Sequence, residues 1–165
     1  MTPARPRKIA RRGSRLVFVL EDTRWRAPGL RPLMRRAVRR ALGEGGQDAA
    51  ALTLLLTGAE KLRELNKTFR GKNRATDVLS FPGDGKSDYL GDIAIAYDVA
   101  LADARAQGKT MADHAAHLAV HGVLHLLGHD HAEAGTAEAM ERLEARILAP
   151  LGISDPYAVS SARAA

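Results

Sequence analysis

Short apolar segments recur along the chain and predict four β-strands. "RLVFVL" (15–20) is rich in β-branched and aromatic residues, and "ALTLLLT" (51–57) is a continuous apolar run. Such a run is typical of an interior strand that is covered on both faces. "VLSF" (78–81) predicts a short strand, and "GDIAIAY" (91–97) has the alternating pattern of a fourth strand.

Apolar residues spaced three to four positions apart predict the helices. The segment 31–42 has a proline near its start and stops at the glycine-rich stretch 43–46. Its predicted core stripe consists of Leu33, Ala37, Val38, Ala41 and Leu42. Further helices are expected at 59–69, 99–107, 111–127 and near 136–149, with Asp98 as the cap of the helix 99–107.

The pattern indicates one domain between two polar tails. Residues 1–14 combine prolines with many cations and predict a mobile basic arm, residues 15–157 form the domain, and 158–165 form a tail. The longest nearly apolar run, 49–59, is too short to cross a bilayer, and "LVFVL" is too short for a secretory core. We therefore expect a cytoplasmic protein with no membrane partner.

The composition limits the catalytic and metal-binding groups that the chain can use. The 165 residues include no cysteine, so disulfides and thiol catalysis are excluded and any metal must bind to nitrogen or oxygen. The net charge is +6, with cations concentrated before residue 83 and acids in excess after it. A polyanion docking on the basic half would explain this asymmetry, and so would a solvated arginine-rich face; charge alone does not decide.

The candidate chemistry lies in "HGVLHLLGHDH" (121–131). His121 and His125 are one helical turn apart, so their imidazoles share a face and could grip one metal ion. Gly128 follows where a helix can end in a left-handed conformation, which would let the chain double back and bring His131 in as a third ligand. Three nitrogens and a water make a tetrahedral zinc site with an open position, as in catalytic zinc.

Other assignments of these histidines stay open. His129 could replace His131, although it leaves less chain for the turn, and the cluster could also hold no metal at all. His117 lies eight residues from His125, or roughly 12 Å along a helix, which is too far for one ion. We expect His114 and His117 to pack in the core or to support a ligand.

The ligand spacing is also that of the metzincin proteases, H-E-x-x-H-x-x-G-x-x-H. The glutamate after their first histidine is the general base, and that position is Gly122 here. The chain has the ligand spacing of these proteases but lacks the residue that accepts the proton in peptide hydrolysis. Hydrolysis of a different kind of bond is therefore favoured.

With these residues in view, the chain resembles the YbeY family of metal-dependent endoribonucleases. The resemblance covers about residues 50–157 and rests on four blocks in order. They are "LNKTFRGKNRATDVLSFP" (65–82), "LGDIAIAYDVA" (90–100), "HLAVHGVLHLLGHDH" (117–131) and "MERLEARILAPLGISDPY" (140–157). Two positions depart from the family pattern: Ala75 replaces a common proline and His129 a common tyrosine.

The resemblance implies a zincin-like α+β domain, in which a small mixed four-stranded sheet packs with about five helices. It places one Zn²⁺ on His121, His125 and His131, and the family's arginine after N-x-x-[FY] falls on Arg70. It also implies single-strand cleavage in 16S ribosomal RNA 3′-end maturation and ribosome quality control. The implied partners are ribosomal RNA, the small ribosomal subunit and ribosome-assembly proteins.

Roles for individual cations follow from this chemistry. Arginine suits a developing phosphorane charge better than lysine, which makes Arg70 the catalytic candidate; a surface arginine ending the helix 59–69 is the alternative. Aromatic residues are few, so RNA contacts should fall mainly on the backbone. The expected RNA-facing cations are Arg31, Arg35, Arg36, Arg39, Arg40, Lys61, Lys67, Lys72 and Arg74.

Two rival functions remain at this point. A peptide hydrolase is supported by the ligand spacing and opposed by Gly122. A non-catalytic ribosome-assembly factor with a structural metal is opposed by the open fourth position.

Overall fold

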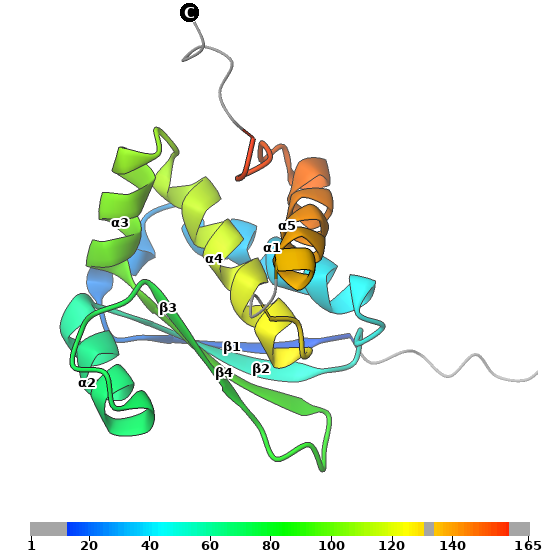
Figure 1. Cartoon of the computed structure of the whole chain (residues 1–165), viewed down its shortest axis with the longest axis horizontal. Helices are drawn as coiled ribbons and strands as arrows, with labels where there is room; N and C mark the ends of the chain where they lie inside the picture. The colour runs from blue at the N-terminus through cyan, green and yellow to red at the C-terminus, as the bar shows by residue number, and fades with distance from the viewer. Residues whose placement is uncertain (1–12, 131–133, 159–165) are drawn as a thin grey trace, which may run out of the picture.

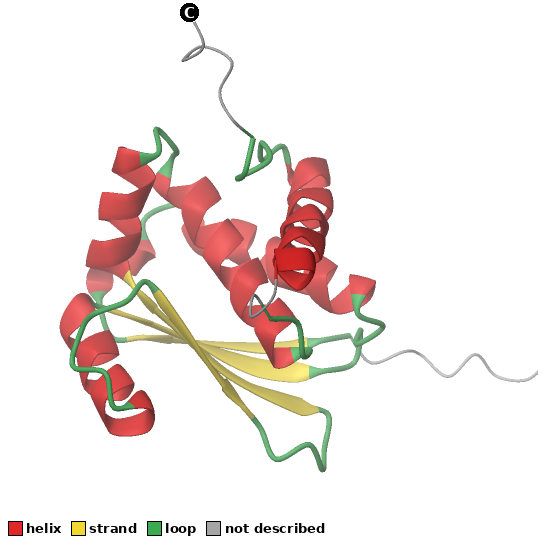
Figure 2. Ribbon diagram, viewed as in Figure 1, coloured by secondary structure: helices red, strands yellow, loops and turns green. Residues whose placement is uncertain are grey.

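The computed structural model describes residues 13–130 and 134–158. Four strands form one mixed sheet in the order β1-β2-β4-β3 (Figures 1 and 2). β1 (Arg15–Leu20), β2 (Ala51–Thr57) and β4 (Tyr89–Ala96) are parallel, and β3 (Val78–Pro82) runs antiparallel to β4 at one edge. The predicted α+β class with a small mixed sheet is therefore confirmed.

Five α-helices pack on this sheet in the described part of the chain, and the larger group lies on one face (Figure 1). That face carries α1 (Leu30–Glu44), α3 (Tyr97–Ala106), α4 (Met111–Leu126) and α5 (Ala134–Leu148). α2 (Ala59–Arg70) lies on the opposite face. Two short 3-10 helices, η1 (Thr23–Arg26) and η2 (Ala149–Leu151), complete the elements.

The core divides between the two faces of the sheet. The larger cluster joins Leu52, Leu54 and Leu56 of β2 to α1, α4 and α5, and the smaller one packs Leu62 of α2 on β3 and β4. The interior position of β2 is confirmed, but full cover on both faces was a wrong expectation. Among the described helices, only α2 lies on the second face, and Leu55 is half-buried there.

α1 shows the predicted division between a buried and a charged face. Ala37, Val38, Ala41 and Leu42 are buried as expected, and Met34 occupies the core where the pattern had favoured the half-buried Leu33. In the ranges that are described, no helix combines the length and apolar character needed to span a bilayer. The predicted basic arm lies almost wholly in residues 1–12, outside the described residues.

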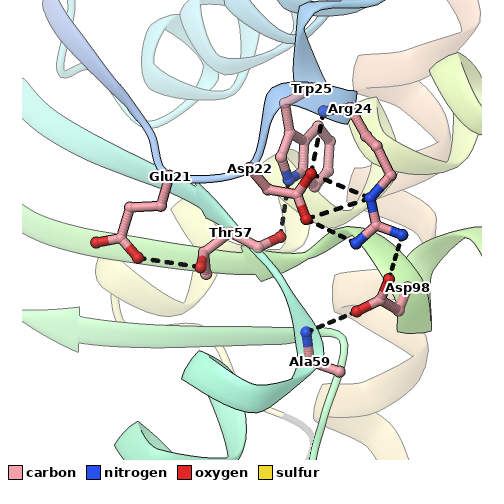
Figure 3. Close-up of polar contacts among 7 residues, drawn as sticks. All are labelled: Glu21, Asp22, Arg24, Trp25, Thr57, Ala59 and Asp98. Carbon is pink, nitrogen blue, oxygen red and sulfur yellow. Dashed lines mark hydrogen bonds and ion pairs between the residues drawn. The ribbon is translucent and has the colours of Figure 1, made fainter.

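Asp98 does not cap α3, because that helix begins one residue earlier and Asp98 sits in its first turn. Its carboxylate instead accepts a hydrogen bond from the backbone N–H of Ala59 at 3.0 Å, at the start of α2 (Figure 3). It also pairs with Arg24 of η1, which in turn pairs with Asp22, the residue before that helix. The side chain that was expected to start one helix therefore joins three elements at the carboxyl ends of the parallel strands.

Candidate metal centre and cleft

His121 and His125 lie side by side near the C-terminal end of α4. Thr110 caps the start of this helix, where its hydroxyl accepts the N–H of Asp113 at 3.1 Å. The two imidazole rings have centroids 4.5 Å apart, and their Nε2 atoms approach to 3.0 Å. The one-turn spacing in the sequence therefore places two ring nitrogens next to each other.

Glu144 of α5 orients the first of these rings. Its side chain is completely buried, and its Oε1 lies 2.8 Å from Nδ1 of His121. The other oxygen, Oε2, lies 2.6 Å from Nε2 of His117 and accepts the hydroxyl of Tyr157. A proton on Nδ1 of His121 donates to the carboxylate and leaves the Nε2 lone pair toward His125, which is the usual support of a metal-binding histidine.

These hydrogen-bond partners stabilise the negative charge of Glu144. Burial alone would raise the pKa of this carboxyl, but its three hydrogen-bond donors outweigh burial and lower the pKa to about 2. Burial and the adjacent carboxylate raise the pKa of Tyr157 well above its usual range. Glu144 is therefore an anion and Tyr157 a neutral donor at neutral pH.

The donor set fits a zinc ion. Two nitrogens bound tetrahedrally at 2.0–2.1 Å from zinc lie about 3.3 Å apart, close to the 3.0 Å between the two Nε2 atoms. After α4, Gly128 has φ +96°, and the N–H of His129 returns to the carbonyl of Leu124 at 3.0 Å. The chain thus reverses where the sequence predicted a turn; His131, the proposed third ligand, lies outside the described residues.

Arg70 shares a cleft with the two histidines. It is the last residue of α2, and its Nη2 donates to the carbonyl of Ser80 on β3 at 3.0 Å. The cleft has a volume of about 230 Å³ and is lined by Arg70, Val78, Leu79, Ser80, Pro82, His121 and His125. The catalytic candidate and two candidate ligands, more than 50 residues apart in the sequence, therefore line one cavity.

The other expected RNA-facing cations divide into two groups. Lys67, Lys72 and Arg74 are exposed on α2 and the loop after it, next to Arg70, while Lys61 is half-buried. The α1 residues Arg31, Arg36, Arg39 and Arg40 are exposed but do not line the cleft, and Arg40 donates to the Ile147 carbonyl. The remaining one, Arg35, stacks over Phe18 at 4.8 Å.

Gly122 is packed where a metzincin glutamate would stand. A Cβ at this position would lie 2.8 Å from Cγ2 of Ile93, and its carbonyl accepts the Ser80 hydroxyl at 3.1 Å. The peptidase base is therefore absent from a position that has no room for a side chain.

Sequence reasoning missed two features of this region. Glu144 falls on the buried stripe of α5 with Met140, Ile147 and Leu148, so an acid on an apolar stripe was the available signal. The second is a group of Asp77, Asp103 and His114, whose ligand atoms lie within 4.8 Å of one another and could hold a metal ion.

Comparison with known proteins decides the family. The family model described as "Endoribonuclease YbeY" matches residues 21–152. The chain belongs to the YbeY family. The YbeY match begins within the segment after β1, well before the blocks that carry the resemblance in the sequence.

Curated YbeY relatives agree over most of their length. The "Endoribonuclease YbeY" of Alkalilimnicola ehrlichii is 51% identical over 81% of this chain and 85% of its own. That of Paracoccus denitrificans is 44% identical, covering 85% and 88%, and that of Bordetella pertussis is 48% identical, covering 81% and 86%. The solution structure of TM1509 from Thermotoga maritima has the same fold, with a TM-score of 0.58 at 20% identity over 88% of this chain and 97% of that one.

Proposed function

We propose that this chain is a zinc-dependent endoribonuclease that cuts single-stranded RNA. In the cell it would mature the 3′ end of 16S ribosomal RNA and act in ribosome quality control in the cytoplasm. The small subunit and assembly proteins would be its partners. The convergence of Arg70 with two Nε2 atoms in one cleft carries the proposal, on a chain whose relatives are named endoribonucleases.

His121, His125 and His131 would hold one zinc ion. Zinc supplies a Lewis acid and lowers the pKa of a water molecule toward about 7. Glu144 fixes the ring of His121 through Nδ1, with Nε2 of that ring beside Nε2 of His125. Because Glu144 has no exposed surface, it positions a ligand and does not reach the substrate.

Arg70 would bind the phosphate that is cut. A guanidinium offers five N–H donors in a planar fork, and the Ser80 carbonyl takes one of them at 3.0 Å. The remaining donors suit the non-bridging oxygens of a phosphodiester, whose charge grows during cleavage. The bond to Ser80 sets the direction of the fork toward the cleft before RNA arrives.

RNA would reach the cleft along the cations that surround Arg70. Lys67, Lys72 and Arg74 are exposed there and offer contacts to the phosphate backbone on the approach to the cavity. Such contacts depend on the phosphate charge and not on the base sequence of the RNA, so selection of one RNA end would come from docking on the ribosome.

A cleavage assay with two polymers tests the proposal. Full-length protein of measured metal content is incubated with labelled single-stranded RNA and, separately, with an unfolded protein. We expect cuts in RNA alone, lost in His121→Ala and Arg70→Ala and kept in Arg142→Ala, whose exposed side chain pairs with Glu138 on α5 and does not line the cleft.

Each other outcome contradicts the proposal in its own way. Cuts that survive both changes identify a contaminating nuclease. Cleavage of the unfolded protein indicates a peptidase, and bound metal with neither activity indicates an assembly factor.

A further inference from the structure

A second cluster of potential metal ligands lies at the other end of α4 from His125. Asp77 directly precedes β3, Asp103 belongs to α3, and His114 lies in the first turns of α4. One ligand atom of each residue lies within 4.8 Å of the others. His114 is seven residues before His121, about 10 Å along the helix axis, so the two places are distinct.

His114 is buried and lacks hydrogen-bond partners. Its side chain is 3% exposed, and neither ring nitrogen has a partner among the described residues. Burial, followed by the charges of His117 and Lys109, lowers the pKa of His114 to about 4, so the ring is neutral at neutral pH. An orphaned buried nitrogen is costly in a folded protein and indicates an absent partner.

The carboxyl groups of Asp77 and Asp103 beside this ring also have no lysine or arginine partner among the described residues. Asp77 accepts the N–H of Val78 at 2.8 Å. Burial and the adjacent Asp77 raise the pKa of Asp103. Lys109, whose positive charge acts on His114, donates instead to the carbonyl of Pro156.

We propose that Asp77, Asp103 and His114 bind a divalent transition-metal ion, separate from the ion proposed at His121. Two carboxylates and one imidazole form a mixed oxygen and nitrogen site, which suits Mn²⁺ or Zn²⁺. The ion gives the orphaned nitrogen a partner and cancels the repulsion between the acids. Asp77 and His114 line a cavity of about 350 Å³ whose lining also includes Lys109, His117, His121 and Tyr157, while Asp103 lies outside that lining.

The ion would hold the loop that leads from Arg70 to β3 in place without contacting RNA. Asp77 ends the loop 71–77, which leads from Arg70 to β3, and the other two ligands belong to α3 and α4. Binding therefore ties this loop to the helical layer, and the site stands whether or not the chain cuts RNA.

The experiment measures Mn²⁺ binding with the first centre removed. Untagged full-length His121→Ala/His125→Ala protein is stripped with a chelator, dialysed against Mn²⁺ and assayed by metal analysis and electron paramagnetic resonance. Asp103→Asn and His114→Gln are added separately to this background. Asp113→Asn is the matched control, because Asp113 is adjacent in sequence but outside the cluster.

We expect about one Mn²⁺ per chain in the background and in the Asp113→Asn control. Asp103→Asn and His114→Gln should each weaken binding at least about tenfold, while circular dichroism shows that they remain folded. No stoichiometric Mn²⁺ in the background, or equal binding in all variants, would overturn the proposal.

Discussion

Glu144→Gln tests the support of the metal centre without changing its shape. The glutamine keeps the volume of the buried side chain but removes the charge that accepts hydrogen bonds from His117, His121 and Tyr157. The amide must also turn an N–H₂ group toward donors that already face it. We therefore expect both stability and metal affinity to fall.

The magnitude follows from the pKa of Glu144. Its lowering from 4.5 to about 2 means that folding favours the charged form, net of its desolvation. At about 1.4 kcal/mol per pKa unit, the charge contributes on the order of 3 kcal/mol at neutral pH. This contribution is complete above the unfolded pKa and is lost as pH falls toward 2. Loss of a ligand's carboxylate partner also weakens metal binding about 10- to 100-fold.

Urea denaturation of metal-free protein at pH 7 and competition with a zinc chelator measure the two effects. Glu138→Gln is the control, because Glu138 is an exposed acid on the same helix and should change stability by less than about 0.5 kcal/mol. If Glu144→Gln behaved like this control in both assays, the carboxylate would not orient the histidine.

Three further changes test other parts of the account. Gly122→Ala should destabilise the protein by about 1 kcal/mol, since overpacking against Ile93 at 2.8 Å exceeds the gain in helix propensity; a higher melting temperature would contradict this. Asp98→Asn should lower the free energy of unfolding most at neutral pH and less as pH falls below about 4, because the Ala59 N–H and then Arg24 lower the pKa of Asp98; a pH-independent difference in urea stability would refute it. Arg70→Lys should slow RNA cleavage about 100-fold while the salt dependence of RNA binding stays unchanged; equal rates would show that charge alone suffices.

Features governed by neighbours in the sequence were predictable. The bounds of β1 and β2 match the apolar runs, and the turn at Gly128 follows from its position after α4. His121 and His125 converge because a helix places residues four apart on one face. Local periodicity fixes such contacts before any tertiary structure is known.

Features that depend on packing between distant elements were not predictable. Glu144 meets His121 only because α5 lies against α4, and no local pattern encodes that pairing. Asp98 looked like a local cap, yet its partners Arg24 and Ala59 are brought to it by the sheet. The incomplete cover of β2 likewise reflects how far one helix extends over the second face.

A crystal structure of the full-length protein grown with zinc would show whether His121, His125 and His131 bind the ion together. We predict that Nε2 of His121 and Nε2 of His125 bind a zinc ion with His131 as the third protein ligand and Arg70 facing the remaining position, whether or not a second ion occupies the site of Asp77, Asp103 and His114. A structure in which these imidazoles point apart, with zinc bound elsewhere, would contradict it.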